Sequence, residues 1–201
     1  MVAEGNKAEP GRFDRTQNKT ARSSEMTVIA VHCDDRHRFS KPSRLSIRLI
    51  AGHGIAGDAH AGQLIQHRYQ ARQTPQMSNN RQVHLIQSEL FEQVRDLGFT
   101  VGPGDLGENI TTRALDLLGL PLGTHLHLGD TAVVELTGLR TPCGHIDKFQ
   151  KGLKRVMIVR ASIGVTFRAG VFGVVRASGD VAVHDVITVE LPIRRTLLPA
   201  I

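Results

Sequence analysis

The chain has 201 residues, 40% of them hydrophobic and 22% charged, which is typical of a globular protein rather than a disordered or fibrous one. No stretch approaches the roughly 20 apolar residues of a membrane-spanning helix, and two cysteines are too few for a disulfide-dense scaffold or a four-cysteine zinc site. The net charge of +6 favours anionic ligands, but one tyrosine and no tryptophan supply few rings for stacking single-stranded nucleic acid.

The first 25 residues are predicted to form a disordered extension, because they are polar and charged with hardly any apolar content. They also lack the apolar segment of a secretory signal. Together with the low cysteine content, this favours a reducing cytoplasm as the location of the protein. We expect residues 26–201 to form one domain, since a chain of this length can bury most of its apolar surface in a single core.

Short β-branched or alternating segments predict strands at residues 27–31 and 45–50. A glycine-rich loop follows at 52–62, and residues 68–81, rich in Gln, Asn and Arg, are expected to wander over the surface. The further predicted strands lie at 83–86, 124–128, 131–136, 170–176 and 181–189. Ser178-Gly179-Asp180 is interpreted as the turn between the last two of these strands.

One helix is predicted after the strand at 83–86. Ser88 can cap its first turn and Gly98 can end it. The apolar residues expected on its buried face are Leu90, Phe91, Val94 and Leu97. Many short strands with Gly/Asp turns and only one clear helix favour an all-β barrel or sandwich over alternating strands and helices.

Residues 52–57 match the G-x-G-x-x-G pattern of a dinucleotide-binding loop. The pattern requires a helix whose first turn holds the pyrophosphate, and residues 58–63 show no amphipathic period. Asn79 and Asn80 stand where the acidic residue of the fingerprint would be expected. We therefore do not interpret this segment as a nucleotide site.

Cys143 lies in the segment Leu139-Arg140-Thr141-Pro142-Cys143-Gly144-His145. A thiolate is both a nucleophile and a soft metal ligand, and neighbouring cations such as Arg140 and His145 lower the pKa of a thiol. The composition alone leaves open that Cys143 is a small buried hydrophobic residue. Cys33, near the end of the first predicted strand, is assigned a structural role.

Two glycine-rich loops carry further polar candidates, Asp58 and His60 in one and Glu108, Asn109 and Thr111 in the other. Glycine lets such backbone approach a ligand closely, although the same residues also serve in ordinary turns. Asp58 and His60 also allow a zinc or iron site. The histidines that would complete it are His84, His125, His127 or His145. That signal is weak, because ten histidines scattered without a spacing motif produce such sets by chance.

The excess positive charge lies in the last third of the chain. From Arg140 onward ten Lys and Arg residues oppose four acidic residues, which accounts for the whole net charge of +6. This field is either a solvated basic face or a site for an anion. Nucleic acid is the less favoured partner, because no nucleic-acid-binding motif accompanies the charge.

Taken together in chain order, these segments resemble the MOSC domain, the family named after the C-terminal domain of molybdenum cofactor sulfurase. The segments with the resemblance include S-K-P-S at 40–43, G-I-A-G-D-A-H-A-G at 54–62, P-G-D-L-G-E-N-I-T-T at 103–112, L-R-T-P-C at 139–143 and G-V-F-G-V-V at 170–175. The resemblance spans about residues 28–190. No single segment is specific, but the ordered set is.

The resemblance implies a strongly twisted, mostly antiparallel β-barrel with a few helices. It also implies that Cys143 ligates molybdenum in a pterin cofactor (molybdopterin), a role that suits a soft thiolate, or that Cys143 carries sulfur. Cations and backbone amides must then hold the phosphate of the cofactor. The positions that the resemblance assigns to cofactor binding are Lys41, Asp58, His60, Glu108, Asn109 and Thr111. Arg140 is assigned to a phosphate or a substrate.

The sequence departs from the family pattern at two places. Phe172 stands near a position where the family often has Tyr or Trp, and phenylalanine lacks the polar group with which those two rings form a hydrogen bond. Residues 150–162 are more basic than expected, which indicates a different rim for the substrate. The resemblance does not extend to the pyridoxal-phosphate-dependent half of the full sulfurase, so we do not expect this chain to carry out desulfuration alone.

The first hypothesis is therefore a molybdenum oxidoreductase that reduces small N-hydroxylated bases or amines. The chain contains no flavin, haem or iron–sulfur motif, so electrons would come from a separate protein. The alternative is a sulfur carrier that holds a persulfide on Cys143. A third, a basic nucleic-acid adaptor, rests only on the charge of the last third.

Overall fold

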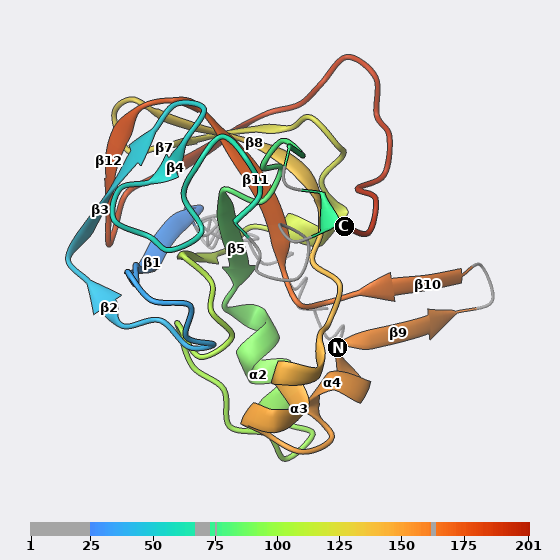
Figure 1. The fold of residues 1–201 in the computed structure, drawn as a ribbon. Helices are drawn as coiled ribbons and strands as arrows, with labels where there is room; N and C mark the ends of the chain where they lie inside the picture. The colour runs from blue at the N-terminus through green and yellow to red at the C-terminus, as the bar shows by residue number, and fades with distance from the viewer. Residues whose placement is uncertain (1–24, 67–72, 75, 162–163) are drawn as a thin grey trace, which may run out of the picture.

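The computed structural model describes residues 25–66, 73–74, 76–161 and 164–201, and Figure 1 shows a mainly β protein with a few short helices. All but the last residue of the predicted N-terminal extension therefore lie outside the described residues. Residues 68–72 and 75 of the predicted segment 68–81 are also outside them. In the described part of the chain, no helix has both the length and the apolar character needed to cross a membrane.

Eight strands form one large mixed sheet in the order β13-β7-β8-β11-β5-β6-β1-β2. Their bounds are β1 Thr27–His32, β2 Ser43–Arg44, β5 Val83–Gln87, β6 Ile110–Arg113, β7 His125–Leu128, β8 Ala132–Leu139, β11 Val171–Ala177 and β13 Ile187–Glu190. Every neighbouring pair is antiparallel except β5 and β6, which run parallel. The expected mostly antiparallel, mainly β architecture is confirmed. The pairing does not by itself show a closed barrel, and closure stays a prediction.

The burial pattern explains why these segments form strands. Along β7 and β8 every second side chain is buried, as expected for strands with one face on the core. Four consecutive residues of β5, from Val83 to Ile86, are buried, which is typical of a strand covered on both faces. One core fills the space between the strands. A second lies where three helices, α2 (Glu89–Arg95), α3 (Gly144–Phe149) and α4 (Leu153–Val156), pack around Leu106 and Ile86.

Two small sheets complete the β structure. β12 (Gly179–Ala182), β3 (Ser46–Ile50) and β4 (Gly54–Ile55) form one, and β9 (Ile158–Ala161) and β10 (Gly164–Phe167) form a separate hairpin. In Figure 1 this hairpin projects away from the body of the protein. The segment that matches the dinucleotide pattern forms a turn and β4, and residues 58–66 contain no helix, so the helix that the dinucleotide fingerprint requires does not follow it.

The predicted turn at 178–180 and the single strand at 181–189 are wrong. β12 begins at Gly179 and pairs with β3, whereas β13 pairs with β7. Residues 183–186 lie between these two strands and break the predicted single strand. Gly179 was interpreted as a turn residue, but it is the first residue of a strand. A Cβ at Gly179 would collide with Thr131 and Ala132, so glycine is required there for close packing of the backbones.

The predicted helix is α2, Glu89–Arg95, and its buried residues are Leu90, Phe91 and Val94. Gly98 follows with a φ of +86°, a conformation that glycine adopts without strain. Two details of the prediction are wrong. Ser88 occupies the N-cap position, but its side chain makes no capping hydrogen bond, and the side chain of Leu97 is exposed.

Within the ranges that the structure describes in full, three further short helical segments were not predicted: η1 (Leu117–Gly119), α3 (Gly144–Phe149) and α4 (Leu153–Val156). Of these, α3 matters most for the site, because Cys143 is its N-cap residue. The segment before it, at the end of β8, is held by the last residues of the chain. Ile201 donates its backbone N–H to Leu139 and accepts hydrogen bonds from the backbone and hydroxyl of Thr141.

Candidate functional site

A cavity of about 680 Å³ collects residues from segments that lie far apart in the sequence. Its walls come from the loop at 37–41, from 79–84, from 106–109, from the segment 140–145 and from Phe172 and Ile201. Such a volume lies within the range of small-molecule and cofactor sites. A smaller polar cavity of about 450 Å³ lies elsewhere and contains none of the predicted site residues.

Five of the predicted site residues line this cavity, and three stand behind its wall. The lining residues are Lys41, His60, Asn109, Arg140 and Cys143. Asp58, Glu108 and Thr111 are buried and do not line it. The predicted set is thus brought together, but as two groups, one facing the cavity and one holding the first in place.

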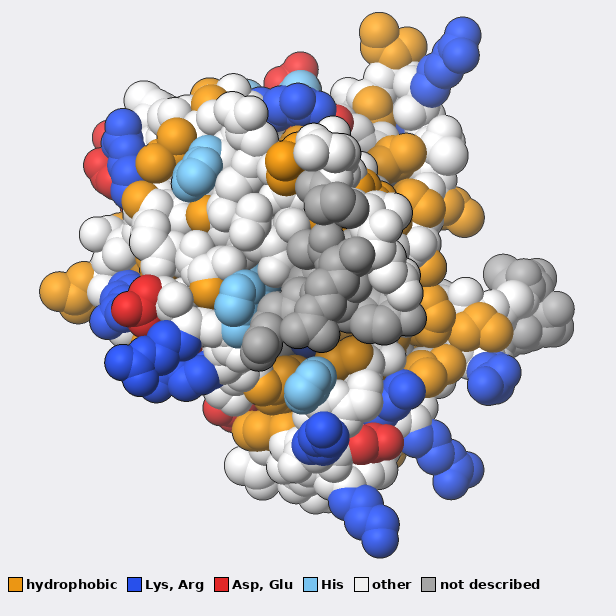
Figure 2. Space-filling model, in the orientation of Figure 1, with side chains coloured by type: hydrophobic (Ala, Val, Ile, Leu, Met, Phe, Trp, Pro, Cys, Tyr) orange, Lys and Arg blue, Asp and Glu red, His pale blue; other side chains and the backbone are white. Residues whose placement is uncertain are grey.

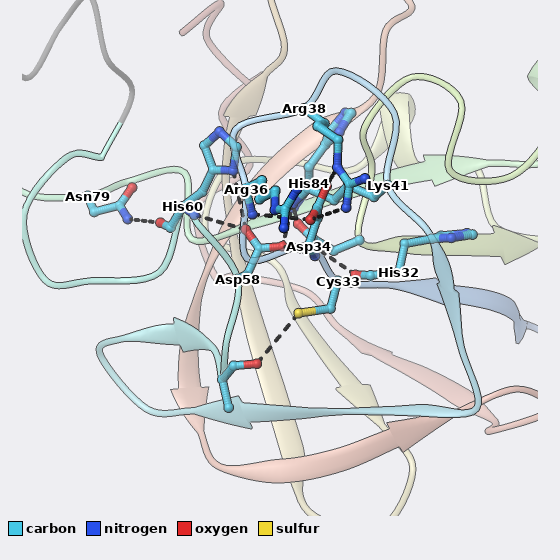
Figure 3. Close-up of polar contacts among 12 residues, drawn as sticks. His32, Cys33, Asp34, Arg36, Arg38, Lys41, Asp58, His60, Asn79 and His84 are labelled. Carbon is cyan, nitrogen blue, oxygen red and sulfur yellow. Dashed lines mark hydrogen bonds and ion pairs between the residues drawn. The ribbon is translucent and has the colours of Figure 1, made fainter.

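Asp58 is the centre of the supporting group (Figure 3). One carboxylate oxygen, Oδ2, accepts from Lys41 Nζ at 2.6 Å and from Asn109 Nδ2 at 2.9 Å. The other, Oδ1, accepts from the backbone N–H of His60 at 2.9 Å and lies 3.2 Å from His60 Nδ1. One buried carboxylate therefore orients three residues of the cavity wall.

The electrostatics of this group favour a charged pair. Burial alone would raise the pKa of Asp58, but the hydrogen bonds from His60 and the charge of Lys41 outweigh it and hold the pKa well below the ordinary value. The side chains of Lys41 and Asp58 are both almost completely buried. A buried ion pair of this kind costs several kcal/mol of desolvation per ion, which only well-placed hydrogen bonds offset.

A second buried carboxylate fixes the loop that leads to Lys41. Asp34 accepts two hydrogen bonds from the guanidinium of Arg38, at 2.6 and 2.8 Å. These bonds, together with the backbone N–H of Arg36, lower the pKa of Asp34 to about 2. Arg38, held in this way, is one of the residues that line the cavity.

Glu108 braces the other glycine-rich loop. Its Oε1 accepts the backbone N–H of Gly104 at 2.5 Å and the hydroxyl of Thr111 at 3.2 Å. Burial raises the pKa of Glu108, and its Oε2 has no hydrogen-bond partner among the described residues. Gly107, next in the loop, has a φ of +79° and packs against the carbonyl of Phe39, so a side chain there would not fit.

Cys143 and Arg140 lie side by side on the segment between β8 and α3. The Cys143 thiol is partly exposed and faces the cavity. Burial lowers the pKa of Arg140, while the electrostatic interactions of its guanidinium with Cys143 and Glu108 oppose this effect. Arg140 also donates to the Leu106 carbonyl at 2.6 Å and lies over the ring of Phe39 at 5.9 Å. A fixed cation therefore stands beside the thiol, as the sequence predicted.

Two cavity residues, Arg81 and Phe39, were missed, and His84 was considered only as a possible metal ligand. Arg81 lies over the ring of Phe172 at 5.5 Å and makes no ion pair among the described residues, rather than wandering over the surface as predicted. Buried His84 donates from Nε2 to the Ala169 carbonyl at 2.9 Å, and burial and Arg140 hold its pKa well below the ordinary value. Phe39 stacks on His145 at 6.0 Å. The sequence did single out Phe172, the residue beneath Arg81, through its position in the G-V-F-G segment.

The other cysteine and the other histidines stay outside this arrangement. Cys33 is buried, its thiol lies 3.6 Å from the carbonyl oxygen of Ala56, and burial raises its pKa, so its structural assignment agrees with the geometry. His125 and His127 lie on β7 and contact Glu135 and Glu190. Within the described ranges, no group of three or more His, Cys, Asp or Glu side chains is arranged to hold a metal ion.

The fold and the cavity define a class: a mainly β protein that presents one cysteine to a cation-lined cavity. The MOSC domain family matches residues 65–188, more than half of the chain. The chain belongs to the MOSC domain family.

Solved structures with the same fold support this placement at the level of the fold. YuaD from Bacillus subtilis aligns over 82% of this chain and 95% of its own, with 23% identity and a TM-score of 0.64. YiiM from Geobacillus stearothermophilus (14% identity, 82% and 75% coverage, TM-score 0.58) and YiiM from Escherichia coli (15%, 85% and 73%, 0.57) are also similar. No curated protein sequence matches the chain.

Proposed function

We propose that the protein is a molybdenum-cofactor-dependent reductase of the cytoplasm that removes oxygen from small N-hydroxylated bases or amines. The observation that supports this most directly is the partly exposed thiol of Cys143 inside a cavity of about 680 Å³ lined by cations. MOSC membership points in the same direction, because these domains are associated with the molybdenum cofactor.

The donor set fits a molybdenum–pterin group. A thiolate is a soft ligand of the kind that such a metal accepts, and Cys143 supplies one at the cavity wall. A pterin phosphate requires cations that are not already neutralised. Lys41 and Arg38 are paired with buried carboxylates, whereas Arg81 and Arg140 have no carboxylate within ion-pair distance among the described residues. Arg81 and Arg140 are therefore the residues that would hold the phosphate.

The reaction would consume two electrons and two protons. The N–O bond of an N-hydroxylated compound breaks, the hydroxyl takes one proton and leaves as water, and the nitrogen takes the second proton to form N–H. The bound cofactor would supply the two-electron chemistry, and the protein supplies ligation and orientation. His145 is exposed at the cavity rim, where it can donate a proton to the leaving oxygen.

The test compares Cys143→Ala with Cys33→Ala, both produced in a host that makes the cofactor. Molybdenum is measured by elemental analysis and the pterin by fluorescence after oxidation. Reduction of an N-hydroxylated purine is followed with reduced benzyl viologen. We expect molybdenum and activity in the wild type and in Cys33→Ala, and loss of both in Cys143→Ala. Equal molybdenum in all three proteins would refute the ligand assignment.

The exposure of the Cys143 thiol beside Arg140 also favours the second candidate, a sulfur carrier. A desulfurase persulfide would transfer its outer sulfur to this thiol. Mass spectrometry of the intact protein after exposure to a cysteine desulfurase tests this. A reducible adduct of about 32 Da, present in Cys33→Ala and absent in Cys143→Ala, with no bound molybdenum, would favour the carrier over the reductase.

A further inference from the structure

One side chain of the cavity wall, the imidazole of His84 on β5, has no role in the function proposed above. His84 is only 5% exposed, whereas several other histidine side chains reach the surface in Figure 2 (pale blue). Burial and the charge of Arg140 hold the pKa of His84 well below its ordinary value, so the ring is neutral. Because burying a polar ring is costly unless it is hydrogen-bonded, its contacts indicate what it does.

The ring of His84 acts as a hydrogen-bond donor. Its Nε2 lies 2.9 Å from the carbonyl oxygen of Ala169. A carbonyl oxygen only accepts hydrogen bonds, so Nε2 must carry the single proton of the neutral ring. Ala169 is buried and stands two residues before β11, the strand that runs beside β5 in the sheet (Figure 1). The imidazole therefore ties the chain that enters β11 to β5.

The residue after Ala169 holds the segment that carries the thiol. The carbonyl of Gly170 accepts the backbone N–H of Arg140 at 2.9 Å. The guanidinium of Arg140 in turn interacts electrostatically with Cys143. The imidazole of His84 and the backbone of Arg140 are thus linked through the turn at Ala169 and Gly170.

This turn is packed tightly against His84. Gly170 has a φ of +97°, and a Cβ there would collide with the His84 ring and with the Leu85 carbonyl. A close-packed contact transmits a displacement instead of absorbing it. Loss of the imidazole would therefore be felt at the Gly170 carbonyl and at Arg140.

The backbone of His84 is bonded to the other half of the site. Its N–H donates to Asn109 Oδ1 at 3.1 Å, and its carbonyl accepts the Asn109 backbone N–H at 2.8 Å. Asn109 also donates to Asp58, the carboxylate that orients Lys41. One residue therefore connects the Asp58 group with the segment of Cys143.

We infer that His84 is a positioning residue, which holds Arg140 beside the Cys143 thiol through its hydrogen bond to the Ala169 carbonyl. This inference rests on the function proposed above, in which Cys143 is the working thiol. A misplacement of about 1 Å near a reacting group can lower a rate by about 10²-fold. A hydrogen bond that touches neither the thiol nor a substrate therefore affects turnover.

The test removes the donor in His84→Leu and restores it in His84→Gln, whose amide nitrogen stands three bonds from Cβ, as Nε2 does in histidine. The matched control is His32→Leu. His32 is also buried, but it does not line the cavity, and its Nε2 has no hydrogen-bond partner among the described residues. If His84→Leu does not fold, His84→Asn replaces it, because its amide is one bond too short to reach Ala169. All variants carry Cys33→Ala, which leaves Cys143 as the single thiol of the chain.

Three properties are measured for the parent and each variant. The melting temperature reports stability. The rate at which iodoacetamide alkylates Cys143 is measured in the folded, metal-free protein at a fixed neutral pH. The third is kcat and KM for reduction of an N-hydroxylated purine by the cofactor-loaded protein with reduced benzyl viologen.

We expect His84→Leu to lose at least about tenfold in kcat with a smaller change in KM. Its Cys143 should be alkylated at least about threefold more slowly, because a displaced Arg140 no longer favours the thiolate. His84→Gln should recover most of both rates. His32→Leu should lower the melting temperature but keep both rates.

Equal rate changes in His84→Leu and His32→Leu, compared at the same folded fraction, would overturn the inference, since His84 would then act on stability alone. Unchanged rates in His84→Leu would overturn it too. So would a His84→Gln variant that melts like the parent but is as slow as His84→Leu. A parent protein without reductase activity refutes the proposed function instead, and the alkylation rates then still decide whether His84 positions Arg140.

Discussion

Replacing Asp58 with Asn tests whether the buried ion pair holds the cavity wall together. The substitution keeps the size of the side chain but removes the charge that Lys41 faces at 2.6 Å. It also introduces an amide nitrogen where both oxygens now accept hydrogen bonds, so one donor must face another donor. Removing one partner of a buried pair costs about 3–5 kcal/mol, against a total stability of about 5–15 kcal/mol.

The assay is urea denaturation followed by far-UV circular dichroism, since the chain has no tryptophan. The control is Asp180→Asn, which removes the exposed partner of Arg48 at 3.0 Å. Exposed pairs contribute about 0–1 kcal/mol. Lys41→Met and the double variant complete a thermodynamic cycle, in which the double variant should be less destabilised than the sum of the single ones. A loss in Asp58→Asn no larger than in Asp180→Asn would refute the reasoning.

Two further perturbations follow from the same geometry. The low pKa of Asp34, about 2, means that its stabilising effect is complete above the ordinary aspartate pKa of 3.8 and is lost as the pH falls toward 2. The melting temperature should therefore fall between pH 5 and pH 2, and less steeply in Arg38→Gln; equal slopes would contradict this cause. Gly170→Ala should destabilise far more than Gly98→Ala, because both have positive φ but only Gly170 lies against His84 and the Leu85 carbonyl. Chemical denaturation measures the free energy of unfolding of both glycine variants. Equal losses of stability would show that backbone strain, and not the close contacts of Gly170, causes the destabilisation.

The sequence predicted local structure where a period or a turn residue is strong. The alternation in β8, the apolar run of β5 and the apolar stripe of α2 all express burial directly. It could not predict α3 and α4, because helices of six and four residues show too little periodicity to be detected. Nor could it predict that β12 pairs with β3, more than 130 residues away in sequence, since such pairing depends on the whole sheet.

The candidate site shows the same division. The family segments predicted that Lys41, Asp58 and Asn109 lie close together, but they did not indicate that Asp58 is buried outside the cavity lining and holds the other two. Arg81 was missed and His84 was considered only as a possible metal ligand, because their roles depend on tertiary contacts with Phe172 and Ala169, residues about 90 positions further along the chain.

The contact between Ile201 and the Cys143 segment has a practical consequence for handling the protein. Ile201 borders the cavity, and its backbone is bonded to both Leu139 and Thr141. An affinity tag attached after it would start at the cavity wall and compete with incoming molecules for space. Purification handles therefore belong at the amino-terminal side, and kinetic data from carboxyl-terminally tagged material should be compared with data from protein whose tag has been cleaved.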